Sequence, residues 1–219
     1  MEMICRDADL VRYEPVLFGD CGIVSQTICG GEGGVIAGTS FTVAGADFVS
    51  GGVEAGQVVH LYSAEEGIDG VFEIVEVAGA EELMISVIRA DDENGAICDV
   101  VGSEVRYSIV SYAAQIRDVT FELTKYFGLG PGDSSSEYGL ADVIDTGDLR
   151  RACVFAVLAG IYATLGRQAG DASGHWEKSL FYQRKFERAR EACRIELDSD
   201  GDGVGEAEIS GGGFRLRRG

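Results

Sequence analysis

The stretch from Gly56 to Ala78, GQVVHLYSAEEGIDGVFEIVEVA, is the clearest indication of how the first half of the chain folds. It contains two short runs rich in Val, Ile and aromatic residues, bounded by Gly, Asp and Glu, a pattern typical of β-strands. Similar runs lie on either side of it: GVIAGTSFTVAG (34–45), ELMISVIRA (82–90) and SEVRYSIVS (103–111). Five or six short strands within about 80 residues predict a small antiparallel barrel or two-layer sandwich over residues 21–110.

A glycine-rich stretch, CGGEGGVIAG (29–38), precedes most of these strands. It lacks the GxGxxG spacing of a dinucleotide-binding turn and is not placed between a strand and a helix. We therefore expect it to form a hairpin loop. Glycine makes up 32 of the 219 residues and proline only two, which favours many tight turns.

The second half of the chain changes to a helical period. Ile116, Val119, Leu123 and Tyr126 follow one another at steps of three and four, which predicts an amphipathic helix over about residues 112–127. After a long loop at 128–147, a second helix is expected from Asp148 to Arg167 and a third from 174 to 197. The second is apolar on all sides between Cys153 and Leu165, so the β module or another subunit must cover it.

These patterns predict an α+β protein: a helical bundle of three main helices and a short N-terminal helix, with an inserted small antiparallel β-barrel or sandwich. The expected divisions are an N-terminal helical segment that packs with the bundle (1–20), the acidic β module (21–110), the bundle (111–197), and an acidic turn with an extended tail (198–219).

The chain is acidic, and its acidity is concentrated in the first half. It contains 37 Asp and Glu against 18 Lys and Arg, a formal net charge of -19. Residues 1–110 hold 20 acidic and 4 basic residues, a net charge of -16, whereas residues 111–219 hold 17 and 14, a net charge of -3. Because phosphate binding requires cations, this balance excludes a protein that coats nucleic acid. The asymmetry predicts two modules with different surfaces.

The targeting and redox features predict a protein made in a cytoplasm. The N-terminus has no basic segment followed by an apolar stretch, so we expect no secretory signal. The apolar run Cys153–Leu165 is shorter than the roughly 20 residues that span a bilayer, and we expect no membrane association. The six cysteines show no CxxC spacing, which disfavours zinc and indicates free thiols.

The motif DSDGDG (198–203) is the sharpest local signal. Asp198, Asp200 and Asp202 with Gly203 match positions one, three, five and six of a calcium loop. Position twelve, where such a loop has a bidentate Glu, is Ile209, and Glu206 and Glu208 are out of register with it. The motif therefore predicts either a calcium site at these three aspartates or a solvated acidic turn that ends the third helix.

The C-terminal stretch SGGGFRLRRG alternates apolar and basic residues after a flexible hinge. One interpretation is a frayed end; the other is an extended arm that binds a partner protein. The predicted partner-binding residues are Phe214, Arg215, Leu216, Arg217 and Arg218.

Catalytic motifs are lacking, and we do not predict an enzyme. The two histidines, His60 and His175, have no serine or cysteine nucleophile motif beside them, and no GxSxG, P-loop or HExxH is present. An enzyme acting on a small or saccharide substrate in the β module is kept as the less favoured alternative.

The order of segments resembles the head–tail adaptor (connector) proteins of tailed bacteriophages. The resemblance covers residues 1–20 and 111–219 and depends on DADLVRYEPVLF (7–18), YQRKFERARE (182–191), DSDGDG (198–203) and RLRRG (215–219). The β module departs from the simplest adaptors, and the resemblance implies no role for it.

The resemblance implies a structural protein of the virion neck, assembled in the host cytoplasm. It implies a homo-oligomeric ring, such as a dodecamer, that contacts the portal protein and neck or tail proteins, with DNA passing through without sequence-specific binding. The tail would dock on the portal. Packing in the bundle and against neighbouring subunits is assigned to Phe155, Leu158, Ile161, Tyr162, Trp176 and Phe186.

Overall fold

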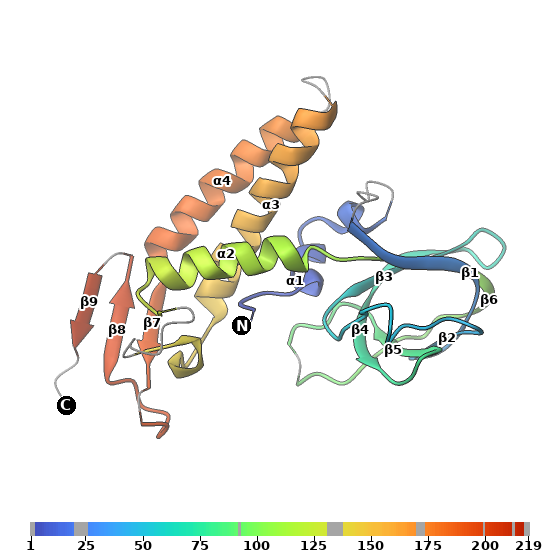
Figure 1. Cartoon of the computed structure of the whole chain (residues 1–219), viewed down its shortest axis with the longest axis horizontal. Coiled ribbons are helices and arrows are strands. Elements are labelled where there is room, and N and C mark those ends of the chain that lie inside the picture. Colours follow the sequence, from blue (N-terminus) through green and yellow to red (C-terminus); the bar gives the residue numbers. More distant parts are fainter. Residues whose placement is uncertain are drawn as a thin grey trace. The chain divides into compact units, whose positions relative to one another are not determined.

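The computed structural model describes residues 3–19, 26–91, 93–130, 138–169, 174–198, 200–211 and 213–216, with the backbone alone at 168–169 and 213–216. The chain folds into two compact units (Figure 1). One unit is Arg6–Tyr112, and the other combines Met1–Cys5 with Ala113–Gly219. The chain therefore crosses between the units twice, after Cys5 and after Tyr112.

The first unit contains a closed antiparallel barrel with the strand order β1-β2-β5-β4-β3-β6. Its strands are β1 (Thr27–Ala37), β2 (Ser40–Val43), β3 (Val58–Ser63), β4 (Ile68–Val77), β5 (Glu82–Ser86) and β6 (Val101–Val110). The Gly56–Ala78 stretch forms the β3–β4 hairpin, in which Val58 pairs with Glu73 and Ser63 with Ile68. Closure leaves no unpaired sheet edge, which removes the surface on which strands of other chains could add.

Alternating side chains fill the interior of the barrel. Ile36, Phe41, Leu61, Ile74 and Ile109 are almost completely buried and belong to this core. Aromatic rings pack edge to face within this core, with ring centroids 5.6 Å apart for Phe41 and Tyr107.

The glycine-rich stretch is part of strand β1 and not the hairpin loop that we expected. A Cβ atom on Gly34 would lie 2.6 Å from the ring of Phe41 and 3.0 Å from the carbonyl oxygen of Val105. A Cβ on Gly31 would lie 3.1 Å from the ring of Tyr107. These glycines therefore leave space for the aromatic side chains of the core. Glycine often occurs inside a strand for this reason, where another group approaches the backbone closely.

The N-terminal segment belongs to the barrel unit from Arg6 onward, not to the helices as we expected for residues 1–20. It forms the short helices α1 (Asp7–Val11) and η1 (Pro15–Phe18). Buried charges fix it to the barrel: Glu73, 1% exposed, pairs with Arg89 at 2.8 Å and lies 3.8 Å from Arg6.

Asp7 is a buried carboxylate of this N-terminal segment. Its Oδ1 accepts a hydrogen bond from the backbone N–H of Tyr112 at 2.9 Å, next to the second crossing between the units. Burial raises the pKa of Asp7 to about 6, although hydrogen bonds from Ser111 and Tyr112 act in the opposite direction.

The second unit contains the helices α2 (Ala113–Tyr126), η3 (Leu140–Asp142), α3 (Gly147–Ala169) and α4 (His175–Ala192). Helix α3 is the centre of the unit: α4 packs along it and α2 contacts it. The α3–α4 contact includes a stack of Tyr162 on Tyr182, with ring centroids 6.0 Å apart. Cys5 and Cys153 also meet inside this unit, with their Sγ atoms 3.1 Å apart.

From the sequence we expected the third helix to bury an apolar stripe of Trp176, Leu180, Phe186, Ala189, Cys193 and Leu197, and only part of this stripe is buried. Ser179, Tyr182 and Ala189 are buried, whereas Trp176 and Leu180 are 52% and 42% exposed. The sequence contains apolar residues on both sides of the helix, so spacing alone did not identify the side that packs on α3.

The third expected helix ends at Ala192, and the chain then continues as a β-strand. Strands β7 (Arg194–Leu197), β8 (Ala207–Ser210) and β9 (Gly213–Leu216) form an antiparallel sheet in this order. Ile195, Leu197, Ala207 and Ile209 are buried, which follows the period of two of a sheet with one covered face. The prediction of a helix over 174–197 is therefore wrong after Ala192, and the prediction of an extended tail is wrong for residues 213–216, which form a strand of the sheet.

The predicted fold class is wrong. The structure is not a helical bundle with a small inserted β module, because a closed six-stranded barrel forms a compact unit of its own. The helices share their unit with a three-stranded sheet. The glycines of β1 concealed the first part of this strand in the sequence, and the short strands at the C-terminal end were not predicted.

Among the described residues, one helix, α3, is long and apolar enough to cross a membrane by length and composition. The segment is Gly147–Arg167, with a mean hydropathy of 1.4, and half of the tested window is buried within the protein. The central helix of a water-soluble domain has the same properties, so this finding is weak support for a membrane span.

Candidate functional site

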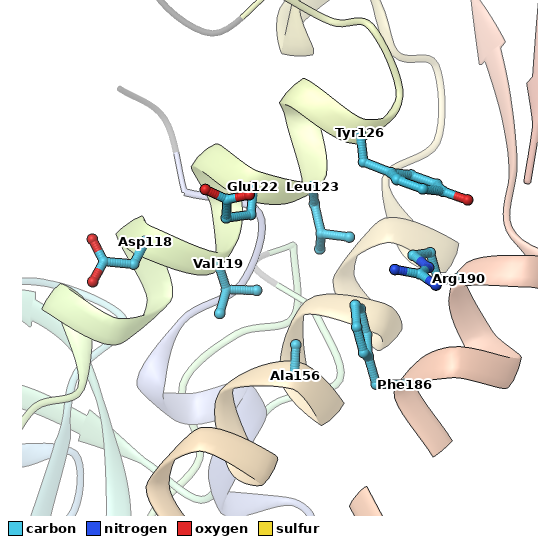
Figure 2. A pocket seen from close by; sticks show the side chains of 8 residues that line it. All are labelled: Asp118, Val119, Glu122, Leu123, Tyr126, Ala156, Phe186 and Arg190. Atoms are coloured by element: carbon cyan, nitrogen blue, oxygen red, sulfur yellow. The ribbon is translucent and has the colours of Figure 1, made fainter. Parts of the chain in front are cut away.

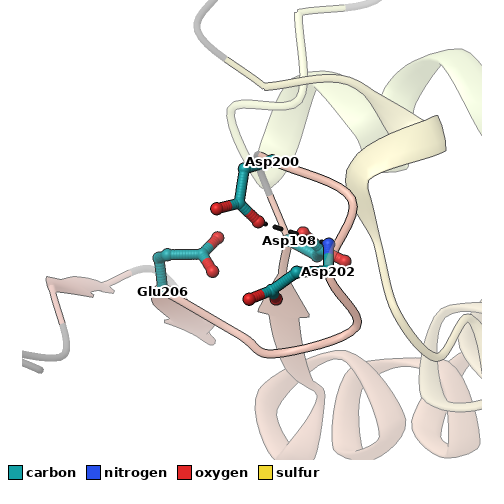
Figure 3. A group of neighbouring side chains, drawn as sticks. All are labelled: Asp198, Asp200, Asp202 and Glu206. Atoms are coloured by element: carbon teal, nitrogen blue, oxygen red, sulfur yellow. Dashed lines mark hydrogen bonds between the residues drawn. The ribbon is translucent and has the colours of Figure 1, made fainter.

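The loop between β7 and β8 brings four carboxylates together (Figure 3). Asp198, Asp200, Asp202 and Glu206 each offer an oxygen, and these oxygens lie within 4.8 Å of one another. At this separation each pair of carboxylates repels by about 1 kcal/mol even in bulk water. A hard divalent cation such as calcium, which prefers carboxylate oxygens, would relieve this repulsion.

Backbone hydrogen bonds hold the three aspartates in this arrangement. Asp198 accepts the N–H groups of Gly201 at 2.6 Å and Gly203 at 2.7 Å, and the hydrogen bond from Gly203 is the main cause of a lowered Asp198 pKa. Asp200 accepts the N–H of Asp202 at 3.2 Å. Both Gly201 and Gly203 have positive φ angles, 77° and 83°, which a side chain would strain.

The structure places the three predicted ligands together and adds Glu206, which the sequence analysis set aside. Ile209, at position twelve of the calcium-loop pattern, is buried in β8 and faces the sheet core. Glu206 stands at position nine, a position that often binds calcium through a water molecule. The loop connects two strands and does not follow a helix. The pattern of a helix–loop–helix calcium site therefore did not identify Glu206 as the fourth carboxylate of the cluster.

The predicted partner-binding tail is partly inside the C-terminal sheet. The backbone of Phe214 pairs with Ile209, Arg215 with Glu208 and Leu216 with Ala207. Arg217 and Arg218 lie outside the described residues. The first part of the tail is thus the third strand of a sheet rather than an extended arm.

A second feature, which the sequence analysis missed, is a groove of about 410 Å³ in the helical unit (Figure 2). Val119 and Leu123 of α2, Ala156 of α3 and Phe186 of α4 give it an apolar lining. The exposed carboxylates of Asp118 and Glu122, also on α2, line the same groove. Helical spacing had marked Val119 and Leu123, but which helix lies opposite them depends on the tertiary fold.

Arg190 forms one wall of the groove. Its guanidinium lies over the ring of Tyr126, 4.7 Å from the centroid, and over that of Phe186 at 5.1 Å. Its Nε is buried and has no hydrogen-bond partner among the described residues.

The six residues predicted for bundle and subunit packing divide into two groups. Trp176 is exposed on α4, and Phe186 lines the groove. The other four are buried inside the helical unit itself and are not available on its surface: Phe155, Leu158, Ile161 and Tyr162.

His60 provides the most enzyme-like geometry of the barrel. Its Nε2 lies 2.9 Å from Oδ1 of Asp69, and a cavity of about 380 Å³ beside it is lined also by Tyr62, Arg106 and Ser108. Within the described part of the chain, neither a serine hydroxyl nor a cysteine thiol is hydrogen-bonded to His60. The arrangement thus lacks the nucleophile–base contact of covalent catalysis.

Comparison with known proteins finds no protein family, no curated protein and no solved structure that matches the chain. A function is therefore inferred from the residues of this chain alone. They offer two candidates: the acidic loop, with the chemistry of a cation site, and the exposed faces of the helical unit, with the chemistry of a protein interface.

Proposed function

We propose that the protein is a structural subunit of a tailed-bacteriophage virion, a head–tail adaptor that forms a ring between the portal and the tail. One observation supports this proposal most strongly: α4 exposes three large apolar side chains, Trp176, Leu180 and Phe181, at 52%, 42% and 47%. Burial of such side chains is the main driving force of protein association, and large exposed clusters of them mark interaction sites. The resemblance of the helical segments to adaptor proteins supports the same function.

The charge of the barrel suits a protein beside passing DNA. Residues 6–112 contain 19 acidic residues and four arginines. All four arginines are paired with carboxylates of the same unit: Arg6, Arg12, Arg89 and Arg106. Each arginine of the barrel thus lies beside a carboxylate that competes with phosphate, and the excess carboxylates repel the DNA backbone, so DNA slides without sticking.

Assembly with the portal protein of the same virus tests this proposal. The purified chain is mixed with portal rings, and the product is separated by sedimentation and imaged by electron microscopy. We expect a ring of this chain attached to one face of the portal, and the same ring in the neck of virions. A chain that sediments apart from the portal at every concentration, with its C-terminal residues intact, contradicts the proposal.

A second candidate function, calcium-dependent stabilisation, is favoured by the four carboxylates of the β7–β8 loop. A cation bound there would fix the hairpin and so the C-terminal sheet that carries the tail. At a calcium concentration 100 times Kd, binding to the folded state alone would add about 2.7 kcal/mol to the free energy of unfolding.

Titration calorimetry with calcium chloride measures this binding directly. Asp200→Ala should abolish the binding heat, whereas Glu191→Ala, at an exposed position of α4, should leave it unchanged. An unmodified chain that gives no binding heat at millimolar calcium, and whose stability is unaffected by a chelator, removes this function.

A further inference from the structure

Two carboxylates of helix α2 have no ion-pair partner among the described residues. Asp118 and Glu122 are exposed and line the groove of the helical unit (Figure 2). They are four residues apart, so they project from the same side of α2 with a separation of about 6 Å along its axis. This side of α2 therefore presents a pair of negative charges beside an apolar hollow.

The hollow is large enough for an aromatic side chain. Its volume of about 410 Å³ is bounded by Leu123 and Val119 on one side and by Phe186 on the other, with Ala156 between them. The small side chain of Ala156 leaves this space open.

Helix α4 presents the complementary pattern on its outer face. Leu180 and Phe181 are exposed, and Arg184 and Arg188 follow at three and seven positions after Phe181, on the same side of the helix. Both arginines are exposed and have no ion-pair partner in the described part of the chain. Their spacing of four residues equals that of Asp118 and Glu122.

We propose that the outer face of α4 in one copy binds the α2 groove of a second copy, with Phe181 in the hollow and Arg184 and Arg188 opposite Asp118 and Glu122. This inference rests on the proposed ring function and specifies which faces join the subunits. The occupant is a second copy because the chain carries both halves of the contact, one on each helix, and does not join them within itself.

The contact is heterologous, since different faces of the two copies meet. Repetition of a heterologous contact produces a closed ring when the rotation closes. The burial of Phe181 and Leu180 would supply most of the affinity, and the charges at the edge would set the register and suppress wrong partners. High salt is expected to weaken the contact through the charged part.

Charge reversal tests the proposed contact in the full-length chain. Asp118→Arg with Glu122→Arg places cations opposite Arg184 and Arg188, and should raise the assembly Kd at least tenfold in sedimentation velocity. Arg184→Glu with Arg188→Glu should do the same. All four positions are exposed, so the variants are expected to fold, which circular dichroism checks.

Complementation separates this contact from a general effect of charge. The fourfold variant restores opposite charges across the contact and should assemble like the unmodified chain. An equimolar mixture of the two double variants should also assemble, because each supplies the charge that the other needs. As a matched control for Arg184→Glu with Arg188→Glu, Arg117→Glu with Arg167→Glu makes the same change of net charge at exposed positions outside the groove and should leave assembly unchanged.

The apolar part has its own matched pair of variants. Phe181→Ser should weaken assembly at least tenfold, whereas Phe121→Ser, at a comparably exposed aromatic of α2 that does not line the groove, should not.

The outcomes distinguish this inference from the function on which it rests. If the chain forms a ring on the portal but both double variants assemble normally, the contact proposed here is wrong and the adaptor function stands. Failure of the fourfold variant and of the mixture to assemble also overturns the contact. If the unmodified chain stays monomeric with and without the portal, both are overturned.

Discussion

Asp7→Asn is expected to change how the stability of the barrel depends on pH. Asp7 is buried, and its Oδ1 accepts the N–H of Tyr112 at 2.9 Å. An asparagine side chain has nearly the same shape and keeps the acceptor oxygen, but it cannot ionise. The substitution thus removes the buried charge and leaves the hydrogen bond to Tyr112.

The magnitude follows from the pKa of Asp7. Burial raises this pKa from 3.8 to about 6, so the folded state binds the proton more strongly than the unfolded state. As the pH rises from about 4 to about 6, ionisation therefore reduces the free energy of unfolding. A difference of about 2 pKa units corresponds to about 3 kcal/mol, which Asp7→Asn should recover at neutral pH but not at pH 4.

Urea unfolding of the full-length chain between pH 4 and pH 8 measures this effect. Circular dichroism follows the whole protein, whereas fluorescence of the single tryptophan, Trp176, reports the helical unit. The stability gained by the variant should grow by about 3 kcal/mol with rising pH in the transition of the barrel unit.

Asp47→Asn is the control for this experiment. Asp47 is exposed, and hydrogen bonds from Ser50 lower its pKa, so its replacement should give a small change of opposite sign. A stability difference between Asp7→Asn and the unmodified chain that is independent of pH would refute the account of Asp7.

Three further predictions concern contacts inside each of the two units. Gly34→Ala should destabilise the barrel by about 1–3 kcal/mol in urea unfolding because its Cβ would overlap the ring of Phe41, whereas Gly79→Ala, with no atom within 4 Å of its Cβ, should change stability little. Glu73→Ala should cost about 3–5 kcal/mol since it leaves the buried Arg89 guanidinium without its carboxylate; a loss below 1 kcal/mol would show that the pair is solvated. The Cys5 and Cys153 thiols, 3.1 Å apart, should be oxidised to a Cys5–Cys153 disulfide when oxidised glutathione is added. The glutathione is reduced as the two thiols lose their hydrogens. Peptide mapping by mass spectrometry should find this cross-link and no other among the described cysteines, and Cys5→Ser should prevent it.

The barrel strands were the most predictable part of the fold. The alternation in Gly56–Ala78 and in the runs around it matches β3–β6, because a closed barrel covers one face of each strand and leaves the other wet. Only the end of strand β1, residues 34–37, lay within a predicted strand run, and its first part was missed because the glycines were attributed to a loop. Their role depends on Phe41 and Tyr107, which are close in space and not in sequence.

The helical unit was less predictable at its C-terminal end. Helix α4 was expected to continue to Leu197, but Cys193 leaves the helix with a ψ of 131°. Ala189, Cys193 and Leu197 have the spacing of a helix, whereas Ile195 and Leu197 have the alternation of a strand. Both patterns occur in the same segment, and only the pairing with β8 shows that it is a strand.

The candidate sites show the same limit. The aspartates of the acidic loop were predicted from spacing, since a local turn brings them together. Glu206 closes the cluster because the loop returns as a β-hairpin, which the calcium-loop pattern of a helix–loop–helix protein does not anticipate. The groove between α2 and α4 depends on how both helices meet α3, and no sequence pattern indicated it.

Native mass spectrometry of the unmodified chain, over a range of concentrations and with portal rings added, measures ring assembly directly. A ring-forming protein gives one dominant species at a whole-number multiple of 23.2 kDa, which shifts to a single portal-bound complex. A lone 23.2 kDa species under all of these conditions would contradict ring assembly.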